Sequence, residues 1–457
     1  MRAIKRCKRH KSPGPDRLVP GLGFRIRDRT LPKTFLHAHI QALPKVASPR
    51  NGLDFRPIAM LDSDYKVYAR VWSSRFRFLL PKLIGDEQTG FVPGRSIHDT
   101  IDVMDLLLAS ISASGHVDAC AVSLDFSKAY DTTFRPFMVH TLEWMGFPPI
   151  VVGALRRMHE KTTACFIVNQ QLAAPFQVTR GIRQGCPLAP LLFILTVEVL
   201  HRHIDAGNGH GGLMVRTAND ESRPLRSASY VDDTTFFCRD QGDPSASKQL
   251  LQKFGKASGL KVNNAKTTII PLHPQAVHED PDFTVLAAGC TTRHLGIQRS
   301  VDKEWQRSEN AIQAKLGIAV SRTTVPIQRI RLVQHIAIPK ILYIARHIWP
   351  TKTQLQRMQK LLQVFIWTGT FDSSRKSRGW VASPVAEHPL SNMGLMSPMS
   401  RNVSKRWQLS WFNGCISSDS KPYRLRRNAS HGCQVVWSLA LQRTSDTRTA
   451  CGRQDGS

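Results

Sequence analysis

The sequence predicts an α+β protein, in which short strands that carry acidic residues precede a region built of helices alone. Ala119–Leu124 is a short apolar run that ends on Asp125, which is typical of a buried strand. Ser229–Phe237 has the pattern of a hairpin, with Asp232-Asp233 at its tight turn. Residues 310–367 instead repeat apolar side chains at helical spacing. Strands and helices are therefore both expected, in separate parts of the chain.

The remaining elements follow from the spacing of apolar residues between turn signals. Periods near 3.6 predict helices, and short apolar runs bounded by polar residues or glycine predict strands. The C-terminal region should present two apolar faces, one around Ile330 and Ile341 and one around Leu362 and Phe365. The other expected helices are 65–80, 101–111, 137–145, 188–203 and 248–258, and the other strands are 165–168, 176–178 and 267–271.

The charge balance favours a polyanionic partner. The 63 Lys and Arg residues outweigh 34 Asp and Glu residues, which gives a net charge of +29. Residues 1–50 hold 13 basic and 2 acidic residues, and residues 301–457 hold 24 and 8, so the middle of the chain is close to neutral. A neutral centre between basic flanks suits carboxylates placed beside a groove for a nucleic-acid backbone. An anionic membrane surface and a solvated basic face stay open as alternatives.

The cysteines and the apolar segments indicate the cellular compartment. Nine cysteines are scattered without a C-x-x-C pair or a zinc-knuckle spacing, which indicates reduced thiols. His431, Cys433 and Cys451 near the end of the sequence would fit a decayed metal site, but a cluster of this kind arises more often by chance. Met1–Lys11 is basic with no apolar segment after it, and no apolar run reaches membrane-spanning length. We therefore expect a soluble nuclear or cytoplasmic protein that is not secreted.

Two sets of carboxylates at strand ends suggest metal-dependent chemistry on nucleotides. Joining nucleotides uses two divalent ions about 4 Å apart, and Mg²⁺ in such sites is held by one or two carboxylates and by substrate phosphates. Asp125 follows one predicted strand, and Asp232-Asp233 form the turn of the predicted hairpin. Aspartate at strand ends and turns is by itself usually turn chemistry, so the inference depends on the surrounding motifs.

Three blocks occur in the order and spacing of motifs A, B and C of reverse transcriptases. They are Leu124-Asp-Phe-Ser-Lys-Ala-Tyr-Asp131, Arg180-Gly-Ile-Arg-Gln-Gly-Cys-Pro-Leu-Ala-Pro190 and Tyr230-Val-Asp-Asp233. The chain therefore resembles the reverse transcriptases of LINE-type (non-LTR) retrotransposons, although Val231 stands where that group more often has Ala. Further blocks extend the resemblance over residues 11 to about 370: Lys11–Asp16, Leu43–Lys45, Phe55–Ile58, Tyr65-Lys66, Gln88–Arg95, Gly259–Asn263 with Lys266, and His294–Ile297.

The resemblance implies which residues bind metal. Asp125 and Asp232 match the ligands that bridge two Mg²⁺ ions, for which Mn²⁺ could substitute, and Asp233 matches a weaker third carboxylate. The peptide carbonyl of Phe126 matches a further oxygen ligand. Lys266 matches the lysine that would donate a proton to the leaving pyrophosphate.

The resemblance also implies which residues bind the nucleotide. Tyr130 matches the aromatic residue that lies under the sugar and clashes with a 2′-hydroxyl; without the motif it would be a core aromatic. Gln184 and Gly185 match the pair that contacts the incoming nucleotide and lets the backbone approach the template base. Lys45 and Arg56 match basic residues that hold the triphosphate, and only their motif position separates them from ordinary surface charge.

The expected architecture is the right-hand polymerase fold. Residues 1–24 would be a basic N-terminal segment, 25–298 the fingers and an antiparallel palm sheet, 299–370 a helical thumb, and 371–457 a basic, poorly ordered tail. The expected partners are an RNA template, a DNA primer and deoxynucleoside triphosphates, with no membrane, and the oligomeric state stays open.

An alternative function also stays open, that of a truncated or domesticated nucleic-acid-binding protein that keeps the fold without turnover. A scaffold freed from catalysis has no physical need for Asp125, Tyr130, Gln184 and Asp232 together, and all four are present. We also expect no endonuclease domain before this region and no Cys-His knuckle after it, so that the chain extends a primer without making one.

Overall fold

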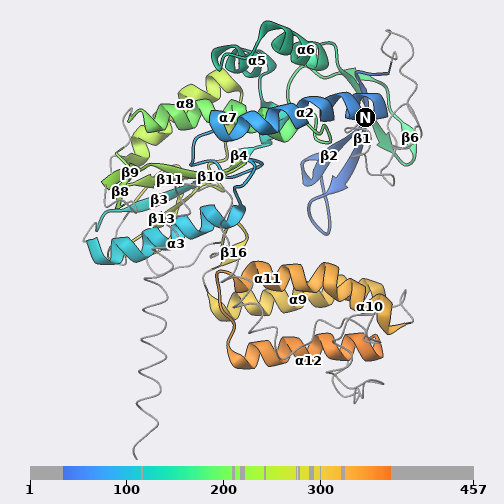
Figure 1. The fold of residues 1–457 in the computed structure, drawn as a ribbon, viewed down its shortest axis with the longest axis vertical. Coiled ribbons are helices and arrows are strands. Elements are labelled where there is room, and N and C mark those ends of the chain that lie inside the picture. Colours follow the sequence, from blue (N-terminus) through green and yellow to red (C-terminus); the bar gives the residue numbers. More distant parts are fainter. Residues whose placement is uncertain are drawn as a thin grey trace, which may run out of the picture. The chain divides into compact units, whose positions relative to one another are not determined.

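The computed structural model describes residues 34–114, 117–207, 211–216, 222–240, 243–273, 275, 278–287, 293–298, 300–320 and 325–371. The chain divides into two compact units, Met1–Gly289 and Cys290–Ser457, and each is considered by itself (Figure 1). The expected basic segment 1–24, the block Lys11–Asp16 and, apart from Phe371, the expected tail lie outside the described residues.

One sheet of the first unit is organised around β1, which pairs antiparallel with β2 and parallel with β5. A short 3-10 turn, η1 (Gly52–Asp54), precedes β2, and its Asp54 carboxylate accepts hydrogen bonds from the backbone N–H groups of Arg50 and Asn51. The strand order is β2-β1-β5-β6, with β7 also paired to β5. The strands are β1 (His37–Pro44), β2 (Phe55–Leu61), β5 (Thr163–Val168), β6 (Gln171–Leu172) and β7 (Phe176–Gln177).

A second sheet, in the order β10-β11-β3-β13-β14, carries the acidic residues. Its pairings are antiparallel except that of the short β14 with β13. Both faces of β3 are buried: Val122 and Leu124 join one core cluster and Ala121 joins another. That two-sided burial explains why apolar residues occupy both alternating sets of positions before Asp125, with only Ser123 polar. The strands are β3 (Cys120–Leu124), β10 (Ser227–Tyr230), β11 (Asp233–Cys238), β13 (Thr268–Pro271) and β14 (Thr284–Val285).

Helices cover the two faces of this second sheet (Figure 1). The larger core lies under α7, whose Leu192, Phe193 and Ile194 are fully buried. The smaller core lies under α3, through Met104 and Leu107. The helices of this unit are α2 (Ser63–Leu83), α3 (Ile97–Ser114), α4 (Ala129–Thr132), α5 (Arg135–Trp144), α6 (Pro149–His159), α7 (Ala189–Asp205) and α8 (Asp243–Ser258). Two short pairs complete the unit, β4 (Phe126–Ser127) with β12 (Lys261–Val262) and β8 (Leu213–Arg216) with β9 (Ser222–Leu225).

Two buried arginines fix the loop that leads into α7. Arg135 donates hydrogen bonds to the carbonyl oxygens of Gly181 (3.0 Å), Val178 (2.6 Å) and His159 (2.5 Å). Arg183 donates to the carbonyl oxygen of Leu36 (3.0 Å), and its guanidinium lies over the ring of a buried tyrosine. Burial lowers the pKa of Arg135 to about 10, with a further contribution from Arg183, so it remains charged at neutral pH. These contacts hold a loop with few regular backbone pairings in one conformation.

The second unit is a helical bundle preceded by a short hairpin. A capping box at Thr351 and Gln354 begins α12, and Gly369 in the left-handed conformation ends it. Arg329 donates a hydrogen bond to the carbonyl oxygen of Ile366 (2.8 Å), which ties α10 to α12. The elements are β15 (Arg293–His294), β16 (Ile297–Gln298), α9 (Val301–Val320), α10 (Pro326–Leu332), the π-helix η2 (Val333–Ala337), α11 (Ile338–Ala345) and α12 (Lys352–Thr368).

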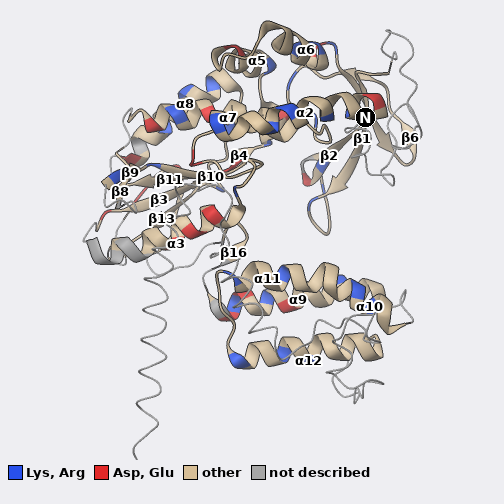
Figure 2. Ribbon diagram, viewed as in Figure 1, with Lys and Arg blue, Asp and Glu red and all other residues tan. Residues whose placement is uncertain are grey.

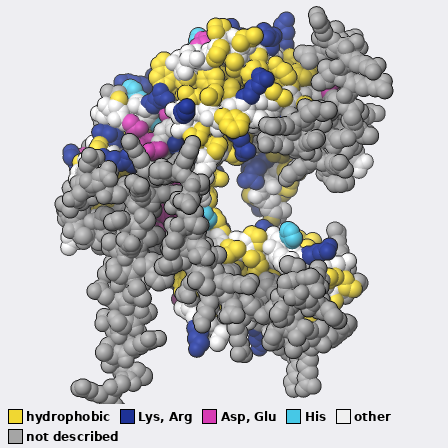
Figure 3. Space-filling model, viewed as in Figure 1, with side chains coloured by type: hydrophobic (Ala, Val, Ile, Leu, Met, Phe, Trp, Pro, Cys, Tyr) yellow, Lys and Arg dark blue, Asp and Glu magenta, His cyan; other side chains and the backbone are white. Residues whose placement is uncertain are grey.

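The surface mixes basic and apolar side chains. Lys and Arg are spread over α2 and α8 in the first unit and over α9 and α12 in the second (Figure 2). Hydrophobic side chains gather over α2, α5 and α6 on the face drawn in Figure 3, and Phe78, Trp144 and Ile150 of these helices are exposed. None of the helices in the described part of the chain is long and apolar enough to cross a membrane.

The structure confirms the predicted α+β class and the expected helices and strands to within a few residues. Several elements were not predicted, among them β1, β2 and α6, besides short pieces such as α4, β4 and β12. β1 and β2 lie in residues 31–61, where the apolar spacing is mixed, and α6 begins with two consecutive prolines. Of the expected apolar face, Ile330, Val333 and Ile341 are buried, although η2 interrupts the helix between them, whereas Ile327 is exposed. The expected domain boundary at residue 298 stays a prediction.

Candidate active site

The site residues predicted from the sequence converge on one cleft of about 1150 Å³ in the first unit. Its lining includes nine of the ten: Lys45, Arg56, Asp125, Phe126, Tyr130, Gln184, Gly185, Asp232 and Lys266. The tenth, Asp233, is the neighbour of Asp232 in the chain. Residues up to 221 positions apart in the sequence therefore share one cavity.

Backbone pairing brings the three aspartates together. β3 and β11 are antiparallel, with Leu124 opposite Thr234. One step further along the ladder, Asp125 leaves the end of β3 beside Asp233, the first residue of β11. Tyr230 pairs with Asp233, so Val231 and Asp232 form a two-residue turn. Antiparallel geometry thus places a carboxylate from each strand end at the same edge of the sheet.

Burial and neighbouring carboxylates raise the proton affinity of Asp232 and Asp233. Burial raises the pKa of Asp232 above its ordinary value, and the charge of Asp125 raises it further. Burial raises the pKa of Asp233 from 3.8 to about 6, with contributions from both Asp232 and Asp125, although its side chain keeps contact with solvent. Like charges on neighbouring carboxylates oppose ionisation, and a bound cation would relieve this repulsion. The oxygen donors are those that Mg²⁺ prefers, so the residues fit a divalent metal.

Asp125 has polar neighbours that orient it. Its carboxylate accepts a hydrogen bond from the side-chain amide of Asn263 (3.1 Å), and the Nζ atom of Lys266 lies 3.8 Å from the same oxygen. The Asn263 backbone N–H also donates to the Asp125 carbonyl oxygen at 2.7 Å. Asn263 therefore fixes both the main chain and the carboxylate of Asp125, a role not predicted from the sequence.

The hairpin turn has a strained backbone. Val231 has a φ of +64°, a conformation that β-branched residues rarely adopt, and its side chain is buried. Such a conformation persists only where surrounding contacts hold it.

Gln88 supplies those contacts. Its side-chain oxygen accepts a hydrogen bond from the Val231 N–H (2.8 Å), and its side-chain nitrogen donates to the Val231 carbonyl oxygen (3.1 Å). Gln88 is 1% exposed. Gly90 lies against the same turn: a Cβ atom there would come within 2.6 Å of the Val231 backbone nitrogen. Gln88–Gly90 therefore clamps the residue before Asp232.

Motif B approaches the first sheet closely. Gly185 has a φ of +123°, and a Cβ atom on it would lie 2.2 Å from the carbonyl oxygen of Ala59 in β2. Only glycine fits this position. The preceding Gln184 accepts a backbone hydrogen bond from Ala59 (2.7 Å), and its side-chain amide donates to both oxygens of Asp131 at 3.2 and 3.3 Å. Asp131, for which no role was predicted, thus orients Gln184.

Tyr130 forms part of the cleft wall and of the core at once. Its ring stacks on Phe193 of α7, with centroids 4.7 Å apart and planes 19° apart. Burial raises the pKa of Tyr130 above its ordinary value, and the charge of Asp232 adds to this, so the hydroxyl stays neutral. The structure therefore places Tyr130 beside the carboxylates with its ring fixed. This position fits both an aromatic residue under the sugar and a core aromatic residue.

Two basic residues of the first sheet and its hairpin also line the cleft. Lys45 follows the end of β1, and its backbone N–H donates to the carbonyl oxygen of Asp54 at 2.7 Å. Arg56 lies on β2, paired with Leu43, and is exposed. The β1–β2 hairpin therefore presents both cations to the cleft.

Phe126, whose carbonyl oxygen is an expected metal ligand, is buried in β4, where it pairs with Val262.

The comparisons with known proteins identify the class. The sequence model of the family described as reverse transcriptase (RNA-dependent DNA polymerase) matches residues 48–297. The chain belongs to this family, and its fold is the right-hand polymerase fold expected from the sequence. The family match and the relatives together confirm the predicted LINE-type (non-LTR) group.

The relatives are proteins of transposable elements. The chain is 26% identical to the transposon TX1 uncharacterized 149 kDa protein of Xenopus laevis, over 89% of the chain and 31% of that protein. It is 24% identical to the Pol polyprotein of retrotransposable element R2DM of Drosophila melanogaster, over 58% of the chain and 25% of the polyprotein. It is also 24% identical to the probable RNA-directed DNA polymerase from transposon BS of the same species, over 65% of the chain and 35% of that protein. The chain thus spans about a third or less of their lengths.

Among solved structures, apo telomerase from Candida tropicalis is similar, with 10% identity and a TM-score of 0.44 over 75% of this chain and 64% of the telomerase.

The raised pKa of Asp233 predicts a pH-dependent stability. Because the folded-state pKa is about 6 and the ordinary value 3.8, the ionised carboxyl destabilises the fold above about pH 6, and the penalty disappears below about pH 4. In metal-free protein, Asp233→Asn should raise the melting temperature at about pH 7.5, and this gain should vanish as the pH falls to about 4. Glu143→Gln, at an exposed ion pair on α5, serves as the control. A gain that does not depend on pH would contradict the assignment.

Proposed function

We propose that the chain is the RNA-directed DNA polymerase core of a non-LTR retrotransposon, which extends a primer 3′-hydroxyl on an RNA template. One observation carries the proposal: Asp125 and Asp232, from two strand ends, share a cleft with Tyr130, Gln184 and Gly185. Asn263 holds Asp125, Asp131 holds Gln184, and the Phe193 ring holds Tyr130. Gln88 holds Val231, the residue before Asp232. The expected substrates are deoxynucleoside triphosphates, an RNA template and a DNA primer.

Asp125 and Asp232 would hold two Mg²⁺ ions, or Mn²⁺ in their place, with Asp233 and the carbonyl oxygen of Phe126 as further oxygen donors. Divalent ions at these carboxylates would supply activation of the primer hydroxyl and neutralisation of the triphosphate. The repulsion among the aspartates supports this proposal. Among the described residues, Lys266 is the one cationic side chain within 4 Å of these carboxylates, so bound metal ions would neutralise the remaining negative charge.

The other cleft residues would position the nucleotide. Lys45 and Arg56 would bind the triphosphate, because both cations line the cleft that also holds Asp125 and Asp232. Gln184, held by Asp131, would contact the incoming nucleotide beside the glycine that admits the template. Lys266 would donate a proton to the leaving pyrophosphate.

We also propose the subdomains that the motif order predicts. Residues 25–298 would form the fingers and palm, 299–370 the thumb, and the basic ends 1–24 and 371–457 would strengthen binding to nucleic acid. Binding through Lys and Arg should be largely independent of sequence and should weaken as the salt concentration rises.

Gln88 is proposed as a positioning residue for this reaction. It does not reach the cleft lining, but it holds the strained Val231 that precedes Asp232. If the turn relaxes, the Asp232 carboxylate moves away from Asp125, and a displacement of about 1 Å in an active site lowers the rate roughly 100-fold.

Asp232→Asn tests the function itself. The loss of a metal ligand removes several kcal/mol of transition-state stabilisation, so primer extension on RNA with Mg²⁺ should fall by at least about 100-fold. Template binding should stay near the parent value, because phosphate contacts provide the affinity. Glu143→Gln is the matched control. A wild-type chain that binds primed RNA without extending it would favour the idle scaffold, and an Asp232→Asn protein at a tenth of the parent rate would refute the metal assignment.

Gln88→Ala should lower kcat roughly 10- to 100-fold and change the KM for nucleotide little, because it shifts Asp232 without touching the substrate. Thr100→Val is the control for general destabilisation. It removes a buried hydrogen bond to Thr89 next to the turn (2.6 Å) but no contact with Val231. Steady-state primer extension and melting curves of both variants would be compared, and equal loss of kcat in both would remove the positioning role.

Tyr130→Ala should raise the incorporation of ribonucleotides relative to deoxyribonucleotides by about tenfold or more, as expected from loss of one steric clash. Tyr130→Phe keeps the ring stacked on Phe193 and loses only the hydroxyl, so its ratio should match the parent. Single-nucleotide extension with each sugar measures the ratio. An unchanged ratio in an active Tyr130→Ala protein would make Tyr130 a core residue only.

A further inference from the structure

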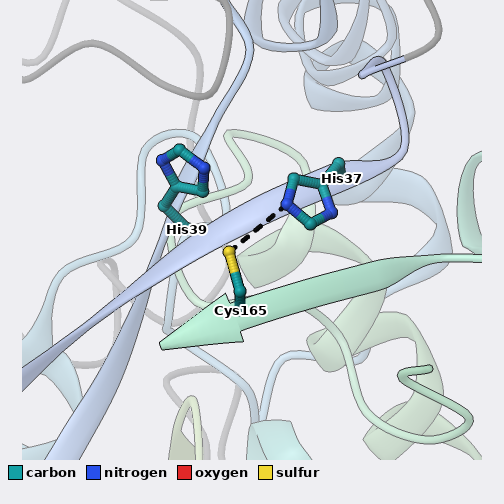
Figure 4. Close-up of side chains that lie close together, drawn as sticks. All are labelled: His37, His39 and Cys165. Carbon is teal, nitrogen blue, oxygen red and sulfur yellow. Dashed lines mark hydrogen bonds between the residues drawn. The ribbon is translucent and has the colours of Figure 1, made fainter. Parts of the chain in front are cut away.

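Three potential metal ligands meet on the first sheet, outside the cleft. His37 and His39 lie two residues apart on β1, and Cys165 lies opposite His39 in the parallel pairing with β5. Figure 4 shows the sulfur of Cys165 directed toward the two imidazole rings from the neighbouring strand. One ligand atom from each side chain lies within 4.8 Å of the other two.

The cluster faces away from the proposed catalytic centre. Successive side chains of a strand point to opposite faces of a sheet. Ile40 and Phe166 line the cleft, so the neighbouring His39 and Cys165 belong to the other face. The cluster is therefore a separate feature from the carboxylate site.

The hydrogen bonds leave one nitrogen of His37 ready for a metal. Its Nδ1 atom lies 2.9 Å from the hydroxyl oxygen of Thr163, and its Nε2 atom lies 3.4 Å from the sulfur of Cys165. If Nδ1–H donates to Thr163, the Nε2 lone pair points at the sulfur. An outer hydrogen bond of this kind orients histidine ligands in metal sites.

We propose that His37, His39 and Cys165 bind one zinc-class divalent cation, with a fourth coordination position open to solvent. Imidazole and thiolate ligands select Zn²⁺ and related ions over the hard Mg²⁺. The two histidines are half-buried, which leaves a path for the ion, while the buried Cys165 forms the floor of the site.

Binding exchanges a proton for the metal. Burial raises the pKa of the Cys165 thiol, so without the ion the sulfur stays protonated. On binding, the S–H bond breaks, a sulfur–metal bond forms, and the proton leaves to solvent with no change in oxidation state.

The ion would link two strands that are distant in the sequence. β1 and β5 are joined by parallel pairing, and β1 continues into the hairpin that carries Lys45 and Arg56. An ion that cross-links the first halves of β1 and β5 would stabilise this sheet and would lie outside the cleft. The inference does not depend on the proposed polymerase function, because it concerns residues on the other face.

Titration of the metal-free full-length chain with Co²⁺, in excess Mg²⁺ to occupy the carboxylates, tests the site. Co²⁺ bound to a thiolate gives a charge-transfer band in the near ultraviolet, which carboxylates do not give. We expect one equivalent with this band in the parent and none in Cys165→Ser or His39→Ala. Cys238→Ala and His140→Asn, outside the cluster, should retain it.

Thr163→Val refines the test, because the residue contacts His37 and no metal. Its affinity for Co²⁺ should fall roughly 10- to 100-fold, as expected for loss of an outer hydrogen bond. Zn²⁺ should also raise the melting temperature of the parent but not of Cys165→Ser. A parent without the thiolate band, or a band that persists in Cys165→Ser, would overturn the proposal, since the latter would place the ion on other cysteines.

Discussion

The ladder between β3 and β11 is the constraint on which the site depends. Its register sets Leu124 opposite Thr234, and that single relation brings Asp125 beside a turn more than a hundred residues later in the chain. A shift by one residue would turn every side chain of the strand to the other face of the sheet. Such a shift is opposed on both faces, because Val122 and Ala121 are each buried in a different core. The helices on the two faces thus determine where the carboxylates meet.

The site carries two destabilising features that the surrounding structure offsets. One is the repulsion among Asp125, Asp232 and Asp233, visible in the raised pKa values of the latter two. The other is the positive φ of Val231. Gln88 and Asn263 hold the backbone on the two sides of the site, through Val231 and Asp125 respectively. Strain and like charge at one place, each with dedicated polar partners, are typical of functional sites.

The far wall of the cleft is held by a different network. Arg135 and Arg183 bind carbonyl oxygens of the loop before α7, and Gly185 then meets β2 at a distance that no side chain would permit. The same β2 presents Arg56. The loop of motif B is therefore packed closely against the basic hairpin, and a cation at His37, His39 and Cys165 would bind the same sheet on its other side.

The sequence by itself determined the α+β class, the family, and the local patterns that predict single strands and turns. The apolar run before Asp125 and the acidic turn after Tyr230 are local patterns, and each predicted its strand. The sequence also contained Gln88, Asp131 and Asn263 within recognisable blocks, but their roles came only from the structure. Each contacts a residue at least 53 positions away, and no local spacing encodes such a contact. The meeting of His37, His39 and Cys165 was decided in the same way, by the parallel pairing of two strands separated by more than a hundred residues. Hydrogen-bonded register, set by the packing of both sheet faces, is the physical reason that tertiary structure alone could assemble them.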